Sequence, residues 1–149
     1  MANIKRKVFA YITHGDRLLV FRHRDQPEAG LQVPAGTVEP GEKLDDAVLR
    51  EAFEETGLAG LRLAHYLGER WRDMSDYGID QLHQRFFYHL ECAATPPETW
   101  SHVETSPSDG SGRHVFEFFW ARLPDEVPLL IGDHDQMLGD LWAAMRSTV

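Results

Sequence analysis

Short segments rich in apolar residues, separated by turn-like sequence, run along much of this chain, and such segments are typical of β-strands. Two of them, residues 8–12 and 17–21, are joined around His14-Gly15-Asp16, so they predict a β-hairpin. Residues 61–71, 81–91 and 114–123 are rich in aromatic and branched side chains and predict three further strands. In the last of these both faces are apolar, which predicts an interior strand covered on two sides.

The pattern changes at residue 43, after which apolar residues recur at spacings of three and four. This period predicts a helix over residues 43–56 that ends at a left-handed Gly57. A second helix is predicted to begin near Asp133, a good N-cap with Gln136 three residues later. One face of that helix carries Met137, Leu138, Leu141, Trp142 and Met145.

Turn-rich sequence separates these elements at residues 37–41, 73–78 and 106–112. The elements together predict a mixed α/β fold in which a β-sheet is packed between helices, an α/β/α sandwich. A length of 149 residues and the absence of any visible linker or repeat predict one domain over residues 1–149.

The net charge of the chain limits the kinds of partner that it is expected to bind. The formal net charge is −9, and such a surface repels nucleic acid, so we expect no stable nucleic-acid partner. The longest apolar runs are too short to span a bilayer and no signal-peptide core is visible, which predicts no membrane partner and a cytoplasmic location. The single cysteine, Cys92, excludes an internal disulfide.

Candidate chemistry lies in the first predicted helix and the loop before it. The residues stand in the pattern G-x5-E-x7-R-E-U-x-E-E-x-G-U, where U is apolar. Its fixed positions are Gly36, Glu42, Arg50, Glu51, Glu54, Glu55 and Gly57, with Ala52 and Leu58 in the two apolar places.

In a helix, residues three and four apart share a face, so three of the glutamates meet at one end of one stripe. Their mutual repulsion disfavours the helix unless a cation intervenes, and Mg²⁺ prefers oxygen ligands. Arg50 can hold a carboxylate in a bidentate grip, and Glu42 is expected to support it ahead of contacting a metal.

This pattern resembles the signature box of the Nudix hydrolase family at every fixed position, from Gly36 to Leu58. The resemblance implies that the carbonyl of Ala35 and the carboxylates of Glu51, Glu54 and Glu55 hold Mg²⁺, with Mn²⁺ as a substitute. The family often has Gly-Gly where this chain has Ala35-Gly36, but a backbone carbonyl does not depend on the side chain. The implied reaction is attack of water at phosphorus in a diphosphate linkage, with Glu51 or Glu54 as the base and Arg50 as support.

Residues outside the box carry weaker signals. Arg22 and Arg24 form a cationic patch with His23 that could hold a phosphate, or they are plain surface. Trp71 and Tyr77 could place a ring against a nucleobase, or they anchor a partly buried loop.

A further carboxylate is expected to complete the metal site, and the sequence offers Glu98, Glu104 and Glu117. Glu98 lies in a turn-like segment and is expected to face solvent. Glu117 interrupts an apolar strand, where an ionised carboxylate needs a metal or a cation such as Arg85, so we rank it first. Glu104 ranks second.

The favoured function is hydrolysis of a nucleoside diphosphate or polyphosphate derivative, a small-molecule substrate. One alternative is a nucleotide-binding module of the same fold that is catalytically weak. Another is an isomerase of isopentenyl diphosphate, which would need a catalytic cysteine near the metal site, and Cys92 lies late in a strand-like segment. The sequence leaves the oligomeric state open between a monomer and a homodimer.

Overall fold

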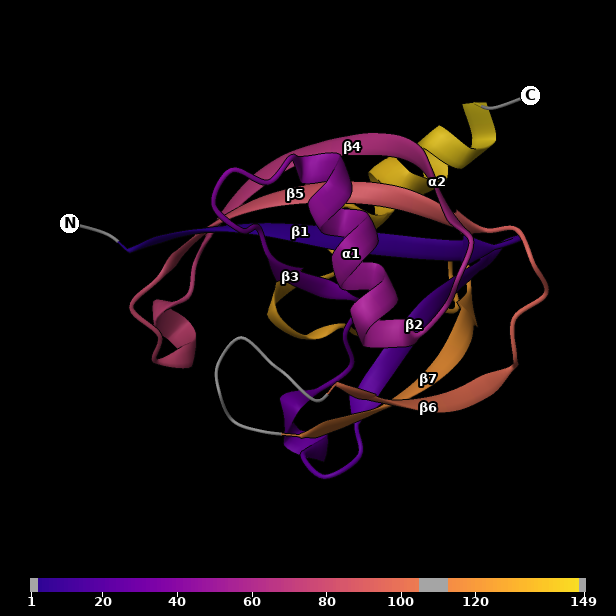
Figure 1. Cartoon of the computed structure of the whole chain (residues 1–149), viewed down its shortest axis with the longest axis horizontal. Helices are drawn as coiled ribbons and strands as arrows, with labels where there is room; N and C mark the ends of the chain where they lie inside the picture. Colours follow the sequence, from indigo (N-terminus) through magenta and orange to yellow (C-terminus); the bar gives the residue numbers. More distant parts are fainter. Residues whose placement is uncertain (1–2, 105–112, 148–149) are drawn as a thin grey trace.

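A computed structural model describes residues 3–104 and 113–147, so the turn-rich segment 106–112 lies outside the described residues. Its described strands form one mixed sheet, in which the order along the main path is β4-β5-β1-β2-β7-β6 and β3 pairs with β1 (Figure 1). The strand bounds are β1 Ile4–His14, β2 Arg17–His23, β3 Ala35–Thr37, β4 Leu61–Asp73, β5 Leu82–Cys92, β6 Thr99–Glu104 and β7 His114–Arg122.

Strand β1 runs through the centre of the sheet. It pairs in parallel with β5 along most of its length, while its other edge pairs with β3 first and with β2 at its end. The β1–β2 hairpin predicted around His14-Gly15-Asp16 is therefore confirmed. Strand β7 has the predicted interior position between β2 and β6, but one of its faces is partly open to solvent at Glu117.

Helices cover both faces of the sheet, which confirms the predicted α/β/α sandwich. Helix α1, Leu44–Thr56, lies in front of the sheet in Figure 1, and α2, Leu138–Ser147, lies behind it. The alternation of side chains along the strands divides the buried residues into two clusters. One contains Ala47, Val48 and Ala52 of α1, and the other contains Met137 and Leu141 from the chain around the start of α2.

Helix α1 has the bounds and the end that its sequence predicts. Lys43 is its N-cap residue, and Gly57 follows it with φ 74° while its N–H donates to the carbonyl of Phe53. The Cβ of any other residue at position 57 would lie 2.8 Å from Nδ1 of His102, so this glycine also allows β6 to approach the helix.

The sequence predicts the start of one helix wrongly and misses one strand. The last helix begins at Leu138 instead of Asp133, because the chain first forms a short 3-10 turn, Ile131–Asp133, in which Gly132 and Asp133 have positive φ. An N-cap residue typically has an extended backbone, whereas Asp133 has φ 60°, and its carboxylate instead accepts a hydrogen bond from Arg72. Strand β6 was not predicted, since its residues have weak alternation and it exists through pairing with β7.

Among the described residues, no helix has the length and apolar character needed to cross a membrane.

Buried neutral histidines are expected to make the fold less stable in acid. Burial lowers the pKa of His89 to about 4, since the ring lies beneath the sheet surface between Thr13 and His65. The unfolded chain therefore binds this proton first, so the stabilisation is complete above about pH 6.5 and is lost as pH falls toward 4. Between pH 7.5 and 5 the loss from His89 is on the order of 2 kcal/mol.

Urea unfolding of the wild type and of His89→Gln at several pH values measures this effect. The variant is expected to lose less stability than the wild type over the same interval, whatever its stability at pH 7.5. Equal losses in the two proteins would mean that His89 does not hold a neutral ring in the fold.

Candidate active site

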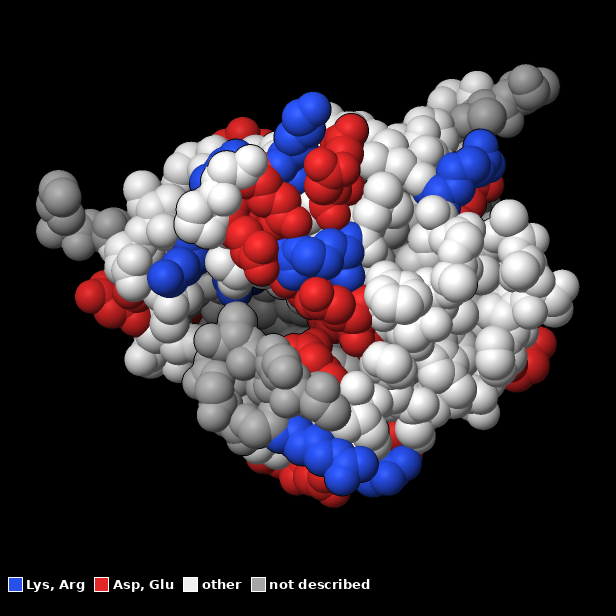
Figure 2. Space-filling view, viewed as in Figure 1, with Lys and Arg blue, Asp and Glu red and all other residues white. Residues whose placement is uncertain are grey.

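A cavity of about 620 Å³ lies between α1, β3 and the ends of β2, β6 and β7. Figure 2 shows acidic side chains gathered around a hollow in this face of the molecule. The cavity is lined by Lys7, Phe21, His23, Gln32, Ala35, Gly36, Thr37, Val38, Glu39, Pro40, Arg50, Glu51, Glu54, Glu55, Glu104, His114 and Phe116. Most fixed positions of the sequence pattern thus reach one cavity.

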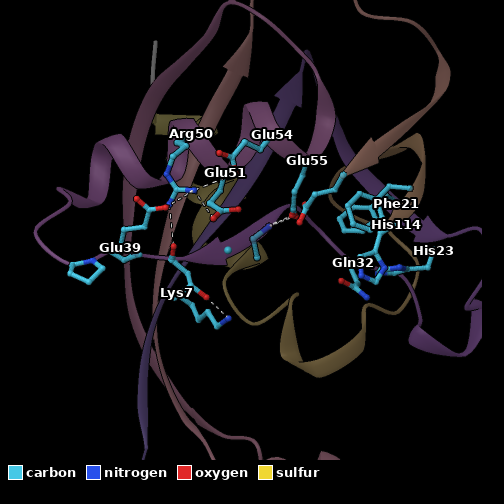
Figure 3. Close-up of a pocket in the computed structure, with 17 residues that line it drawn as sticks. Lys7, Phe21, His23, Gln32, Glu39, Arg50, Glu51, Glu54, Glu55 and His114 are labelled. Carbon is cyan, nitrogen blue, oxygen red and sulfur yellow. Dashed lines mark hydrogen bonds and ion pairs between the residues drawn. The ribbon is translucent and has the colours of Figure 1, made fainter. Parts of the chain in front are cut away.

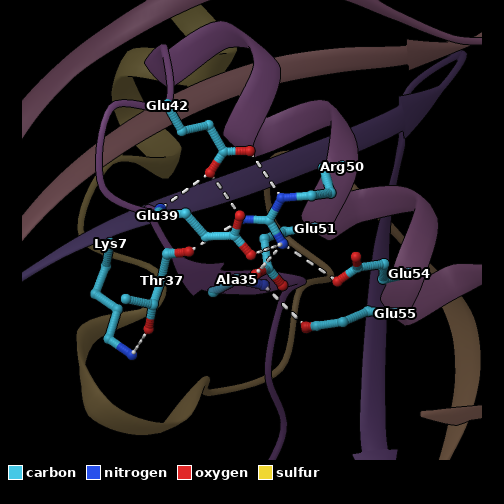
Figure 4. Close-up of polar contacts among 9 residues, drawn as sticks. All are labelled: Lys7, Ala35, Thr37, Glu39, Glu42, Arg50, Glu51, Glu54 and Glu55. Carbon is cyan, nitrogen blue, oxygen red and sulfur yellow. Dashed lines mark hydrogen bonds and ion pairs between the residues drawn. The ribbon is translucent and has the colours of Figure 1, made fainter. Parts of the chain in front are cut away.

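Arg50 holds the acidic residues in place. Its Nε and Nη2 donate to the two oxygens of Glu42 over 2.7 and 2.9 Å, the bidentate grip expected from the sequence. Its Nη1 donates to Glu51 and Glu54 over 2.9 and 3.3 Å, and its Nη2 also donates to the carbonyl of Thr37 (Figure 4). The hydrogen bond from Arg50 lowers the pKa of Glu42 to about 2, so Glu42 stays ionised and fixes the guanidinium.

Two of the glutamates on α1 are withdrawn from solvent. Glu55 is 5% exposed, and both of its oxygens accept the N–H of Ala35 at 3.2 and 3.3 Å. Burial raises the pKa of Glu55 well above its usual range and raises that of Glu51 to about 7, while Arg50 opposes the shift at Glu51. Buried carboxylates of this kind favour a cation beside them.

Gly36 is required by the close approach of Glu51. A Cβ at position 36 would lie 1.9 Å from Cδ of Glu51, so no larger residue fits while that carboxylate occupies its place.

Gly36→Ala is therefore expected to lower kcat/KM by about 10² or more, because a carboxylate displaced by about 1 Å no longer meets its reaction partners. The matched control is Gly139→Ala in α2, where an added Cβ meets nothing within 4 Å and activity should be unchanged. Steady-state kinetics and thermal melting of both variants measure this. Wild-type kinetics in a folded Gly36→Ala protein would contradict the assigned position of Glu51.

Strand β6 closes one side of the site and holds the end of α1. Trp100 donates through Nε1 to the carbonyl of Thr56 at 2.9 Å, and Nε2 of His102 lies 3.0 Å from the carbonyl of Glu54. Glu104, at the end of the same strand, lines the cavity, and its charge adds to the raised pKa of Glu55. Glu104 is thus the later carboxylate that the structure brings to the glutamates of α1.

Glu117 lies elsewhere, which reverses the order in which the sequence ranked the two residues. Its side chain is 36% exposed and lies 3.5 Å from Arg22 and 3.4 Å from Arg24. The expected burial was wrong because its face of β7 is open beside β2, where Arg22 is its partner in register. The cations that pair with Glu117 are therefore Arg22 and Arg24, and not Arg85. Neither Glu117 nor the arginines line the cavity.

The two aromatic residues considered for base stacking also lie away from the cavity. Trp71 and Tyr77 are 49% and 45% exposed, and the guanidinium of Arg72 lies 5.0 Å from the ring of Tyr77. The hydroxyl of Tyr77 accepts the N–H of Gly132. This contact matches the simpler interpretation of Tyr77 as a loop anchor.

Aromatic and imidazole rings form the end of the cavity away from Arg50 and Glu51, beyond Glu55, as Figure 3 shows. The rings of Phe21 and Phe116 have centroids 4.7 Å apart, and the His23 ring meets Phe116 edge-on at 4.7 Å and His114 at 5.4 Å. Gln32 adds an amide beside them. Sequence reasoning missed this end of the cavity, because these residues come from three segments that meet only through strand pairing.

The carboxylates suit a divalent cation by their chemistry. Glu51, Glu54, Glu55 and Glu104 face one cavity, and carboxylate oxygens are the ligands that Mg²⁺ prefers. Among the described residues, no three acidic, histidine or cysteine side chains stand together in a ready-made ligand group. Arg50 and the N–H of Ala35 occupy oxygens of the α1 glutamates instead.

The described residues thus form a mixed α/β sandwich in which a glutamate stripe held by an arginine faces a cavity. The model of the NUDIX domain matches residues 4–137, so the chain belongs to the Nudix hydrolase family that its box predicts. No curated protein gives a match to the chain.

Solved structures with this fold include several Nudix proteins. A UDP-X diphosphatase has a TM-score of 0.65 and 17% identity over 100% of this chain and 66% of its own. A MutT NUDIX hydrolase from Burkholderia pseudomallei has a TM-score of 0.63 and 22% identity over 93% and 98% of the two chains. The NUDIX domain of Shewanella oneidensis NrtR, complexed with ADP ribose, has a TM-score of 0.66 and 17% identity over 97% and 90%.

Proposed function

We propose that this protein hydrolyses the diphosphate linkage of a nucleoside diphosphate or polyphosphate derivative, with Mg²⁺ as its cofactor and Mn²⁺ as a substitute. The observation that carries this proposal is the division of one cavity into two ends. One end gathers glutamates around Arg50, and the other is built from rings that suit a nucleobase. A small molecule with a diphosphate at one end and a base at the other fits both.

In the proposed mechanism the chain supplies metal ligands, a base and a rigid support. Glu51, Glu54, Glu55 and Glu104, together with the carbonyl of Ala35, would hold the cation. When bound, the cation withdraws charge from phosphate oxygens and lowers the pKa of a bound water.

Glu51 or Glu54 takes the proton of the attacking water, since both face the cavity. Arg50 keeps both carboxylates oriented through Nη1 and is itself fixed by Glu42. Water then attacks phosphorus and the P–O bond to the leaving phosphate breaks.

The test is a panel of nucleoside triphosphates, nucleotide sugars, ADP-ribose and dinucleoside polyphosphates, incubated with the protein and Mg²⁺ in ¹⁸O-labelled water. We expect a nucleotide product and one ¹⁸O atom in a phosphate group, identified by mass. A panel without any phosphorus-containing product, or a product that carries the label on carbon, would exclude the proposed reaction.

The same panel separates the two alternatives. A binding module would bind nucleotides of the panel without hydrolysing them. The complete set of glutamates in this chain argues against such a loss of catalysis. An isomerase would need a cysteine in the cavity, whereas Cys92 is 6% exposed, lies outside the cavity lining and contacts the carbonyl of Ala94. A cytoplasmic location and the choice between monomer and homodimer stay predictions.

A further inference from the structure

Two cationic side chains line the cavity within the described part of the chain, Arg50 and Lys7. Arg50 has no donor left for a substrate. Its five N–H groups are matched by five hydrogen bonds, to Glu42, Glu51, Glu54 and the carbonyl of Thr37. A phosphate that enters the cavity must find its protein cation elsewhere.

Lys7 lies on β1, and among the described residues its ammonium group donates one hydrogen bond, over 2.8 Å, to the hydroxyl of Thr37 on the paired strand β3. An ammonium group has three N–H donors, so Thr37 accepts one of them. No carboxylate of the described residues lies within ion-pair distance of Lys7. Burial lowers its pKa, and the carboxylates of Glu51 and Glu55 oppose that shift. A half-buried cation of this kind is stabilised by an anion beside it.

A second cation lies beside Lys7 and adds to the positive potential there, although its like charge also lowers the pKa of Lys7. Arg85 is its partner in register on β5, is 1% exposed and forms no ion pair with a described carboxylate. Arg85 is held instead by the carbonyl of Gly132 and the amide of Gln136. The two cations place positive potential on one side of a site whose other side is acidic.

We propose that Lys7 binds a phosphate oxygen of the substrate, on the side of the cavity away from Glu54, and that Thr37 positions the Lys7 ammonium group for this contact. Figures 3 and 4 both show Lys7 and Glu54 at opposite sides of the site. The substrate diphosphate lies between the carboxylate end, which needs a metal ion to receive it, and an ammonium group that receives it directly. This inference rests on the proposed function for the identity of the anion.

The chain offers a matched control in Lys5. It lies two residues earlier on β1, so its side chain leaves the same face of the sheet, and it is partly buried like Lys7. Lys5 does not line the cavity. Lys5→Met and Lys7→Met therefore change the net charge equally and differ in access to the site.

The probe is methylenediphosphonate, a diphosphate analogue whose P–C–P bridge resists hydrolysis, titrated calorimetrically into the full chain with saturating Mg²⁺. Lys7→Met is expected to raise its Kd by about tenfold or more, because a charge-assisted hydrogen bond is lost. Lys5→Met is expected to change the Kd by less than about threefold, since a charge outside the cavity is screened. Thr37→Val, which keeps the shape but removes the hydroxyl, should raise the Kd by roughly threefold or more.

Circular dichroism and thermal melting show whether each variant is folded. If Lys7→Met does not fold, the Kd of Thr37→Val tests the proposal in its place. A Kd for folded Lys7→Met, or for Thr37→Val in its place, that stays equal to that of the Lys5→Met control would overturn the proposal. So would a wild-type protein that does not bind the analogue at millimolar concentration.

Failure of this inference differs from failure of the proposed function. Binding that depends on Lys7, in a protein that hydrolyses no member of the nucleotide panel, would leave the phosphate site standing and remove the hydrolase. If the wild type hydrolyses a nucleotide and Lys7→Met does so with an unchanged Kd and KM, the hydrolase function stands and the proposed role of Lys7 is wrong.

Discussion

Glu51→Gln and Glu55→Gln are each expected to lower kcat by about 10² or more while the protein stays folded. Glutamine keeps the shape of the side chain but loses the charge that would hold a divalent cation. In Glu55→Gln the new amide oxygen can still accept the N–H of Ala35, and burial already disfavours the charge at both positions. We therefore expect melting temperatures no lower than that of the wild type in the absence of metal.

The control for these variants is Asp46→Asn. Asp46 lies in the first turn of α1, is exposed and does not line the cavity, so it makes the same change of charge on the same helix. Steady-state kinetics with the substrate found in the panel measure all three. Rates within threefold of wild type for both glutamate variants would show that these residues form only a buried structural cluster.

Removal of divalent metal is expected to abolish turnover completely, and Mg²⁺ or Mn²⁺ added in excess over EDTA should restore it. The acidic end of the cavity repels a diphosphate, and Arg50 is fully engaged in holding glutamates, so Lys7 alone cannot offset the charge of the reaction.

Thermal unfolding gives a second measurement that does not need a substrate. Because the metal binds the folded state, melting temperature should rise with Mg²⁺ concentration in the wild type and rise less in Glu55→Gln. EDTA already saturated with Mg²⁺ is the control for effects of the chelator itself. Full turnover in excess free EDTA would exclude the proposed mechanism.

The sequence alone determined the parts of this protein that depend on local spacing. The 3.6-residue period placed Glu51, Glu54 and Glu55 on one stripe of α1, and Gly57 ended that helix at its predicted position. Runs of apolar, aromatic and branched residues between turn-like segments likewise predicted the strands around β1, β2, β4, β5 and β7, because each run is contained in a few consecutive residues. The fixed spacing of Arg50 and Glu42 in the box likewise led us to expect that Glu42 supports Arg50, and Arg50 holds it through two hydrogen bonds.

Tertiary structure decided which residues from distant segments share the cavity. The local pattern favoured Glu117 over Glu104, but strand register placed Glu117 opposite Arg22 and Glu104 opposite His114. The sequence around Lys7 does not show which residues lie beside its side chain. Its proposed role in binding phosphate therefore follows only from the structure, in which it donates a hydrogen bond to Thr37 on the paired strand β3. The reason is physical: one strand's sequence sets which side chains share a face, but the pairing of several strands sets what that face meets.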